Sequence, residues 1–349
     1  MRKPQQKRED GQVPIFSSSG ITGTHSTAMV NAPGVITGRY GTIGEVFYAA
    51  EDFWPLNTTL FVEDFHGNDA EFIYYFLKTL EWSKFTSASA VPGINRNTVH
   101  KETVSLPDIE TQRRIASTLS MLDEKIKTNT EINDNLYAQA KAIFDNHFIN
   151  IDAIPAGWRK GNLLDIANYL NGLAMQKFRP QGNEIGLPVL KIKELRQGSC
   201  DDSSELCSLR IKPEYIIHDG DVIFSWSGSL LVDIWCGGTC GLNQHLFKVT
   251  SDIYDKWFYY LWTAHHLARF IAIAADKATT MGHIKREELA KAEVLIPCEE
   301  DYTSLTSIMQ PIFELIISNR IEARKLAALR DELLPKLMSG EIDVSAIQL

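Results

Sequence analysis

Few residues in this sequence have the types and spacing that catalysis needs. The segment TGRYGTIG (37–44) resembles a phosphate-binding turn, because glycines let backbone N–H groups approach an anion. A nucleotide-binding loop also needs the pattern GxxxxGK[ST], which does not occur, and neither do HExxH or GxSxG. The segment therefore indicates either a structural turn or a nucleic-acid phosphate contact.

Thiol and imidazole groups offer a second kind of chemistry. All five cysteines lie in the second half of the chain: Cys200, Cys207, Cys236, Cys240 and Cys298. The four-residue step from Cys236 to Cys240 is not that of a zinc finger or ribbon, although His218 and His245 could join them. The histidine pair at 265–266 lies in YYLWTAHHLARF (259–270), whose aromatic stripe indicates a core helix with the histidines on its flank. We therefore expect ordinary thiols, no metal site and no catalytic residue, with zinc as the alternative.

The longest pattern in the chain predicts a helix. Residues 110–148 contain no Pro or Gly, and a stripe of mainly apolar residues recurs at alternating steps of four and three. These seam positions are Ile115, Leu119, Leu122, Ile126, Asn129, Asn133, Leu136, Ala140 and Ile143. A single narrow apolar stripe needs a partner helix.

A partner occurs 190 residues later in the same chain. The repeated seam consists of Leu305, Met309, Ile312, Ile316, Asn319, Ala323 and Leu326. Asn129 and Asn319 occupy the same seam position, where a buried Asn fixes register. The matched phase favours pairing within the chain, with a coiled coil between chains as the alternative. Pro311 predicts a kink or a late start of the second helix.

The repeat extends upstream of both helices. ETVSLPDIE (102–110) matches AEVLIPCEE (292–300), and FIYYFL (72–77) matches WFYYLW (257–262). LNTTLFV (56–62) matches LNQHLFKV (242–249), and GVITGRYG (34–41) matches DVIFSWSG (221–228). One unit has been used twice, which predicts two mixed globular domains, each followed by a long helix.

Composition narrows the class of protein. A length of 349 residues suits two domains, and a net charge of −9 argues against a protein that coats DNA with its whole surface. Basic clusters in QKFRP and LKIKELR still allow one basic face. No secretory signal or run of about 18 apolar residues occurs, so we expect a cytoplasmic protein without a membrane partner.

The chain resembles the specificity subunit of type I restriction–modification systems over nearly its whole length. The resemblance is carried by LPDIETQRRIASTLSMLDEKI (106–126), LLPKLMSGEI (333–342) and IPAGWRKGNLLDI (154–166). It implies an α+β protein with two target-recognition domains (1–108 and 151–297). Between them would lie two long helices (109–150 and 298–340) forming an antiparallel coiled coil, with a tail at 341–349.

The same resemblance implies a function. Each domain would read one half of a split, asymmetric site in double-stranded DNA, and the chain would carry neither catalysis nor a cofactor. It would recruit two methyltransferase subunits that use S-adenosylmethionine to methylate adenine N6. A restriction subunit that uses ATP and Mg²⁺ could join the complex.

Candidate contact residues follow from comparing the two copies. Shared residues such as Gly41/Gly228, Asn57/Asn243, Tyr74/Tyr259, Tyr75/Tyr260 and Pro107/Pro297 are assigned to the scaffold, and unlike loops to DNA. The DNA candidates are Ser18, Thr24, His25, Arg39, Lys84, Arg96, Lys177, Arg179, Lys193, Arg196, Lys277, His283, Lys285 and Arg286. The candidates for the helix seam and partner docking are Leu119, Leu122, Ile126, Asn129, Leu136, Met309, Ile312, Ile316, Asn319 and Leu326.

One departure from the family pattern keeps other functions open. The first copy has no counterpart of residues 158–178, so its half-site is expected to be read poorly. A helical scaffold that binds partner proteins and has degenerate DNA reading is therefore one alternative, and a nuclease acting alone is another. The recognised bases and the spacer length do not follow from the sequence, because loop readers have no one-residue code.

Overall fold

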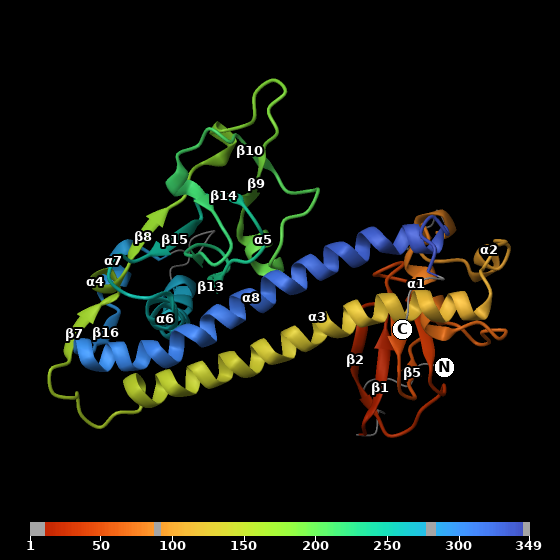
Figure 1. Ribbon diagram of the computed structural model, residues 1–349, viewed down its shortest axis with the longest axis horizontal. Coiled ribbons are helices and arrows are strands. Elements are labelled where there is room, and N and C mark those ends of the chain that lie inside the picture. The colour runs from red at the N-terminus through yellow and green to blue at the C-terminus, as the bar shows by residue number, and fades with distance from the viewer. Residues whose placement is uncertain (1–10, 87–91, 277–283, 345–349) are drawn as a thin grey trace. The chain divides into compact units, whose positions relative to one another are not determined.

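The computed structural model describes residues 11–86, 92–276 and 284–344. The chain forms two compact units: unit 1 contains residues 1–125 and 326–349, and unit 2 contains residues 126–325. The long helices α3 (Ile109–Phe144) and α8 (Glu299–Met338) each contribute to both units (Figure 1). The boundary between the two units therefore falls inside α3 and α8. The domain boundaries expected from the sequence, in contrast, lie at the ends of these helices.

Among its described residues, unit 1 contains two small sheets and three short helices besides its parts of α3 and α8. The strands are β1 (Val13–Ser17), β2 (Gly20–His25) and β5 (Trp54–Pro55), in the order β2-β1-β5, and β3 (Gly34–Gly38), β4 (Val46–Ala49) and β6 (Thr59–Phe61), in the order β4-β3-β6. The helices are α1 (Ala70–Lys78), the 3-10 helix η2 (Trp82–Phe85) and α2 (Arg96–Val99). On α1, the buried Phe72 and Tyr75 pack against Leu119 of α3 and Leu337 of α8. Apolar residues on one face of α1 thus join the globular part to both helices.

Unit 2 repeats this plan with additional elements. One sheet has the order β10-β9-β14-β11 and another the order β13-β12-β15-β8, while β7 pairs with β16. Their bounds are β7 (Arg159–Asn162), β8 (Asn168–Asn171), β9 (Leu187–Leu190), β10 (Leu206–Cys207), β11 (Ile216–Ile217), β12 (Val222–Ser225), β13 (Leu231–Ile234), β14 (Cys240–Leu242), β15 (Leu246–Thr250) and β16 (Glu293–Ile296). The helices are η3 (Asp145–Ile149), α4 (Leu163–Ile166), η4 (Met175–Lys177), α5 (Ile192–Gln197), η5 (Pro213–Tyr215), α6 (Lys256–Asp276) and α7 (Arg286–Ala290).

The two units share their strand pairings. The parallel pair β1–β5 corresponds to the parallel pair β9–β14, and the order β4-β3-β6 corresponds to β13-β12-β15. The aromatic helices α1 and α6 follow β6 and β15 in the same way. The repeat found in the sequence is thus confirmed as a repeat of topology, which means that positions in the two units can be compared one by one.

Within unit 2, α3 and α8 run antiparallel, and buried Asn side chains link them. Asn319 Nδ2 donates to Asn133 Oδ1 at 3.0 Å, and Asn129 Nδ2 donates to Glu322 Oε2 at 2.7 Å. Asn133 Nδ2 donates to the Ile316 carbonyl at 3.2 Å. Rising numbers on α3 therefore meet falling numbers on α8, which fixes both direction and register.

The second long helix contains two prolines, Pro311 and Pro335. α8 begins at Glu299, well before Pro311, so the expected late start is wrong. Pro311 lies on the exposed side of α8, where water can bond the carbonyl that loses its N–H partner. The helix also continues past Pro335 to Met338.

Replacing Asn319 with Ala should destabilise unit 2. Asn133 Oδ1 would lose its donor while Asn133 stays buried, and an unsatisfied buried acceptor costs about 1–3 kcal/mol. We expect a lower urea midpoint of unfolding. Ser318→Ala, at an exposed neighbouring position on the same helix, is the control. Equal midpoints for the two variants would show that the Asn contacts do not hold the helices together.

The part of the helix pair in unit 1 is held by charged and phenolic groups. Asp123 on α3 forms an ion pair with Arg330 on α8. Tyr75 of α1 donates its hydroxyl to Asp123 Oδ2 at 2.7 Å. Burial, together with the bond to Asp123, raises the pKa of the Tyr75 phenol above its usual value, so it remains a donor. One carboxylate thus joins α1, α3 and α8.

Candidate nucleic-acid interface

In unit 2, a polar and aromatic cluster forms where three strands of one sheet end or begin. Trp226 follows β12, His245 precedes β15, and Asn171 ends β8. Trp226 Nε1 donates to Asn171 Oδ1 at 2.9 Å, and Ser227 Oγ lies 2.9 Å from His245 Nδ1. Gln244, next to His245, has its amide Nε2 3.3 Å from His245 Nε2.

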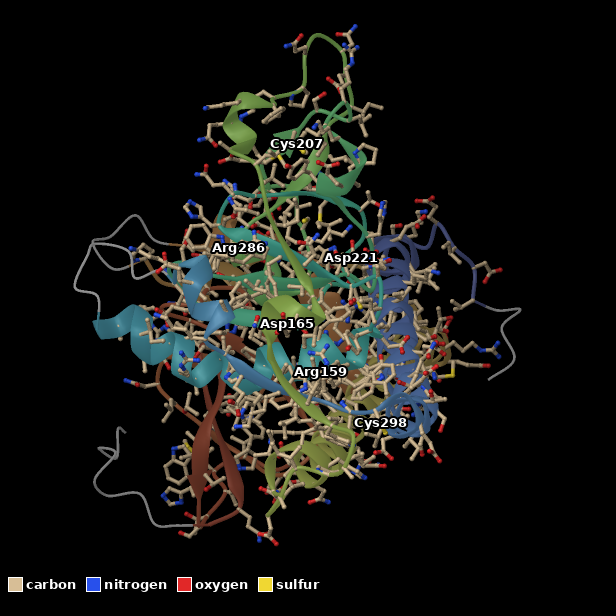
Figure 2. The ribbon with its side chains drawn as sticks, turned by 90° about the vertical axis from the view of Figure 1, so that its left-hand side faces the viewer. Arg159, Asp165, Cys207, Asp221, Arg286 and Cys298 are labelled. Carbon is tan, nitrogen blue, oxygen red and sulfur yellow. The ribbon has the colours of Figure 1, made fainter. Side chains whose placement is uncertain are left out.

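The segment before α7 closes this cluster. The backbone N–H of Ile284 donates to the Trp226 carbonyl at 3.1 Å, and Arg286 Nη1 donates to the Tyr169 carbonyl at 3.3 Å. Figure 2 shows Arg286 at the near end of α7, on the side of unit 2 that faces the viewer. An exposed guanidinium therefore borders the amide, imidazole and indole groups, which we define as cluster 2: Asn171, Trp226, Ser227, Gln244, His245 and Arg286.

Unit 1 has the corresponding cluster at the corresponding strand ends. Arg39 and Tyr40 follow β3, and the guanidinium of Arg39 lies 4.8 Å from the centre of the Tyr40 ring. The backbone N–H of Ile94 donates to the Arg39 carbonyl at 3.0 Å, as that of Ile284 does to Trp226. The atoms Arg39 Nε and Thr58 Oγ1 are buried without a hydrogen-bond partner. We define cluster 1 as Arg39, Tyr40, Thr58, Thr59 and Arg96.

Aligned positions in the two clusters carry different side chains on the same backbone. Arg39 aligns with Trp226, Tyr40 with Ser227, Thr58 with Gln244 and Thr59 with His245. Arg96 and Arg286, in contrast, are the same residue at the same position. Different donors and acceptors on one framework allow two different base sequences to be read, and a shared Arg suits a phosphate.

The structure brings only some of the predicted DNA candidates together. Arg39 and Arg96 lie in cluster 1, and Lys285 and Arg286 lie at or beside cluster 2. Several others are exposed and paired with acids: Lys84 with Glu81, Arg179 with Glu205, and Lys193 with Asp201. Ser18 lies in the β1–β2 turn, Thr24 on β2, Lys177 on η4 and Arg196 on α5, while Lys277 and His283 lie outside the described residues.

His25 does not fit the role of a base reader. Its side chain is 1% exposed and stacks on Trp54 with ring centres 4.6 Å apart. His25 Nδ1 accepts from the Thr27 backbone N–H at 3.0 Å. Because β2 turns this imidazole into the unit, it cannot reach a base edge, and the expectation for His25 is corrected.

Sequence reasoning missed Tyr40, Asn171, Trp226, Gln244 and His245. Tyr40, Trp226, Gln244 and His245 lie inside segments assigned to the framework because their neighbours match between copies, namely GVITGRYG/DVIFSWSG and LNTTLFV/LNQHLFKV. A search for unlike residues inside these matched segments finds the four positions. Asn171 lies in residues 158–178, which have no counterpart in the first copy, so comparison of the copies gives no signal for it.

The segment TGRYGTIG connects β3 to β4 and carries Arg39 and Tyr40 of cluster 1; its Gly41 has φ of 82°, and the helix that a nucleotide-binding loop needs does not follow it. The other candidates, Cys236, Cys240 and His266, are structural in the described residues. Cys236 and Cys240 belong to different hydrophobic cores, and burial raises the pKa of the Cys236 thiol to about 11. His266 Nε2 bonds the Glu293 carbonyl at 2.8 Å, and burial lowers the pKa of its imidazole. Within residues 11–86, 92–276 and 284–344 there is no metal-binding group of His, Cys, Asp or Glu and no helix able to span a bilayer.

Most seam candidates lie buried or half-buried along α3 and α8. Asn129, Met309, Ile316 and Asn319 are buried, and Leu119 is fully buried. The half-buried members are Leu122, Ile126, Leu136, Ile312 and Leu326. In unit 2, Arg324 of α8 forms two bonds to Asp219, at 2.8 and 2.9 Å, which tie this helix to the globular part.

Comparison with known proteins gives a consistent family. The family model described as "Type I restriction modification DNA specificity domain" matches residues 1–138 and again residues 155–329. The type I restriction enzyme MjaIX specificity subunit of Methanocaldococcus jannaschii is 26% identical over 310 residues, which cover 80% of this chain and 71% of that protein. The HindI specificity subunit of Haemophilus influenzae is 20% identical over 354 residues, with coverage of 78% and 77%.

A solved structure has a similar fold. The S subunit of a type I restriction–modification system from M. genitalium matches with a TM-score of 0.60 and 15% identity, over 97% of this chain and 91% of that one. At this identity the match concerns the fold alone. It agrees with a mixed α/β chain with two long helices.

Proposed function

This chain belongs to the type I restriction–modification DNA specificity family, and from that premise we propose that it reads a split, asymmetric site in double-stranded DNA. As a specificity subunit it is non-catalytic, and its role is recognition of DNA sequence. In the proposal, cluster 1 contacts one half-site and cluster 2 the other. The half-buried side chains that differ between the clusters, which are Arg39, Tyr40, Trp226, Gln244 and His245, would select bases, and the exposed Arg96 and Arg286 would hold phosphates.

The observation that carries this proposal is the combination of a like backbone with unlike side chains. The bonds from Ile94 to Arg39 and from Ile284 to Trp226 are matched, yet Arg39 offers guanidinium donors where Trp226 offers a ring. Arg suits the O6 and N7 acceptors of guanine, and Gln and Asn suit adenine. Two reading surfaces of different chemistry fit an asymmetric site better than a palindrome.

We further propose that α3 and α8 form an antiparallel coiled coil that serves as spacer and docking surface. The Asn contacts in unit 2 and the Asp123–Arg330 pair in unit 1 support this arrangement. Two methyltransferase subunits carrying S-adenosylmethionine would dock on it, and a restriction subunit using ATP and Mg²⁺ could join. The names of the curated relatives as type I restriction enzyme subunits support this assignment of partners.

Co-purification with a type I methyltransferase subunit tests the proposal against its alternatives. We expect a complex that selects one split motif from a pool of random duplexes. A complex without sequence selection would favour a partner-binding scaffold with degenerate DNA reading. Cleavage of DNA by the isolated chain with Mg²⁺ would overturn the non-catalytic assignment.

A further inference from the structure

Unit 2 contains a cavity of about 450 Å³ between its part of the helix pair and its globular part. The walls come from α3, from α8, and from residues of β13 and α6, which Figure 1 shows beside α8. All of the lining residues lie between positions 129 and 324, inside unit 2. Small-molecule sites usually have volumes of about 300–1,000 Å³, so this cavity is large enough for a ligand.

The ionic groups at this cavity leave one negative charge without a partner. Arg320 of α8 forms an ion pair with Asp233 of β13, with 2.8 Å between Nη1 and Oδ1. Arg324 of α8 forms an ion pair with Asp219, also at 2.8 Å. Asp134 of α3 is an exposed lining residue that forms no ion pair in the part of the chain that the structure describes. Because carboxylates neutralise both arginines, the net charge at the cavity is negative.

A hydrogen-bond acceptor and aromatic rings line the same space. Asn129 is 1% exposed, and its Oδ1 has no hydrogen-bond partner. The ring centres of Tyr137 and Tyr260 lie 6.3 Å apart, and those of Tyr260 and Phe313 lie 5.6 Å apart. The face of an aromatic ring is negative and attracts cations, and the ring also packs against hydrocarbon. Carboxylate, amide oxygen and rings together therefore favour an organic cation.

We propose that this cavity binds a small organic cation, in which a guanidinium or ammonium group is carried on a short hydrocarbon stem. The charged group would lie between the carboxylate of Asp134 and the ring of Tyr137, which is 36% exposed. The stem would pack on the ring of Phe313. An anion is disfavoured, because Asp134 would repel it and both lining arginines are already paired with carboxylates.

Calorimetric titration of the full chain with n-butylguanidinium and with n-butylurea tests the role of charge. The two probes have nearly the same shape, and only the first is a cation. We expect n-butylguanidinium to bind in the millimolar range or more tightly, and n-butylurea to bind about tenfold more weakly, because it lacks the charge that the carboxylate and the rings attract. Equal binding of the two probes would overturn the choice of a cation, and binding of neither at millimolar concentration would overturn the site. Neither outcome bears on the proposed DNA function, which the cavity does not require.

Substitutions on α3 locate the binding site. Asp134→Asn should weaken the binding of n-butylguanidinium by about fivefold, as expected for the loss of an exposed ion pair. Tyr137→Leu should also weaken it, because the ring face is lost. Glu131→Gln removes the same charge at an exposed position of α3 outside the cavity and should have no effect. Equal effects of Asp134→Asn and Glu131→Gln would show that the cation binds the surface at large, and would overturn the site.

A capped peptide with a central arginine decides the source of the cation. The peptide presents the same guanidinium group on a protein backbone. Weaker binding of the peptide than of n-butylguanidinium supports a free small cation as the ligand. Tighter binding of the peptide would overturn that assignment in favour of a basic side chain of another protein.

Discussion

Lengthening both long helices by seven residues at the boundary between the units should lengthen the preferred gap between the half-sites. The contact Asp123–Arg330 lies in unit 1, and Asn129–Glu322 and Asn133–Asn319 lie in unit 2, so insertions after Lys125 and after Lys325 fall between these two sets of contacts. Duplicating residues 119–125 after Lys125 and residues 326–332 after Lys325 keeps the seam in phase, since seven residues make one heptad. It also leaves every one of these contacts intact and repeats the Asp123–Arg330 pair.

The size of the effect follows from helix and DNA geometry. Seven residues add about 10.5 Å of helix, which is roughly three base pairs at about 3.4 Å each. Three base pairs also turn the DNA by about 100°, given 10–10.5 per turn. We therefore expect weaker binding and a preferred gap about two to four base pairs longer, measured by methylation of a plasmid library that varies only the gap.

A matched control separates length from register. Insertions of seven after Asn133 and after Ala323 have the same length, but they would divide Asn129 from Asn319 and Glu322. This variant should lose stability and activity together. If the first variant keeps its activity with an unchanged gap, the helices do not set the spacing.

Arg39→Ala and Gln244→Ala should each alter recognition of a different half-site. Arg39 lies in cluster 1 and Gln244 in cluster 2, and neither position carries the same residue in the other unit. A good base contact is worth about 1–3 kcal/mol, so we expect roughly 10- to 100-fold weaker discrimination at one half-site and no change at the other. The measurement is binding of the complex to duplexes with one half-site substituted at a time.

The shared arginines provide the contrast. Arg96→Ala and Arg286→Ala should weaken binding to all sequences alike and reduce the salt slope by about one, as loss of a phosphate contact does. Lys78→Ala in unit 1 and Lys291→Ala in unit 2 are exposed controls. If Arg39→Ala and Gln244→Ala behave like the shared arginines, clusters 1 and 2 position DNA without reading it.

The sequence predicted the repeat and the helices well, because both leave periodic signals. The seam spacing places Asn129 and Asn319 on the buried side of α3 and α8. The residues that they contact were harder to predict. A shift of 190 residues finds the equivalent position in the other copy. It does not find the contacting residue, because residue numbers rise along α3 where they fall along the antiparallel α8. Asn319, for example, donates to Asn133, whereas its equivalent in the repeat is Asn129.

The proposed clusters 1 and 2 were predicted from the sequence only in part, for a different reason. Position in or near a loop that differs between the copies, together with charge, selected Lys84, Arg179 and Lys193, each of which pairs with an acid in its own unit. His25 is excluded as a base reader because it is buried. Side chains at strand ends, such as Trp226, are marked by no periodic pattern in the sequence. The convergence of Asn171, Trp226 and His245 is long-range in the sequence and needed the sheet to be seen.

Mapping methylated adenines in DNA from cells that contain this chain and its methyltransferase partner tests the central claim most directly. The claim is that one chain reads two different half-sites across a fixed gap. We predict a single motif with two specified parts of different sequence, separated by a gap of constant length without base preference. A continuous motif, a palindrome or adenine methylation without any motif would contradict it.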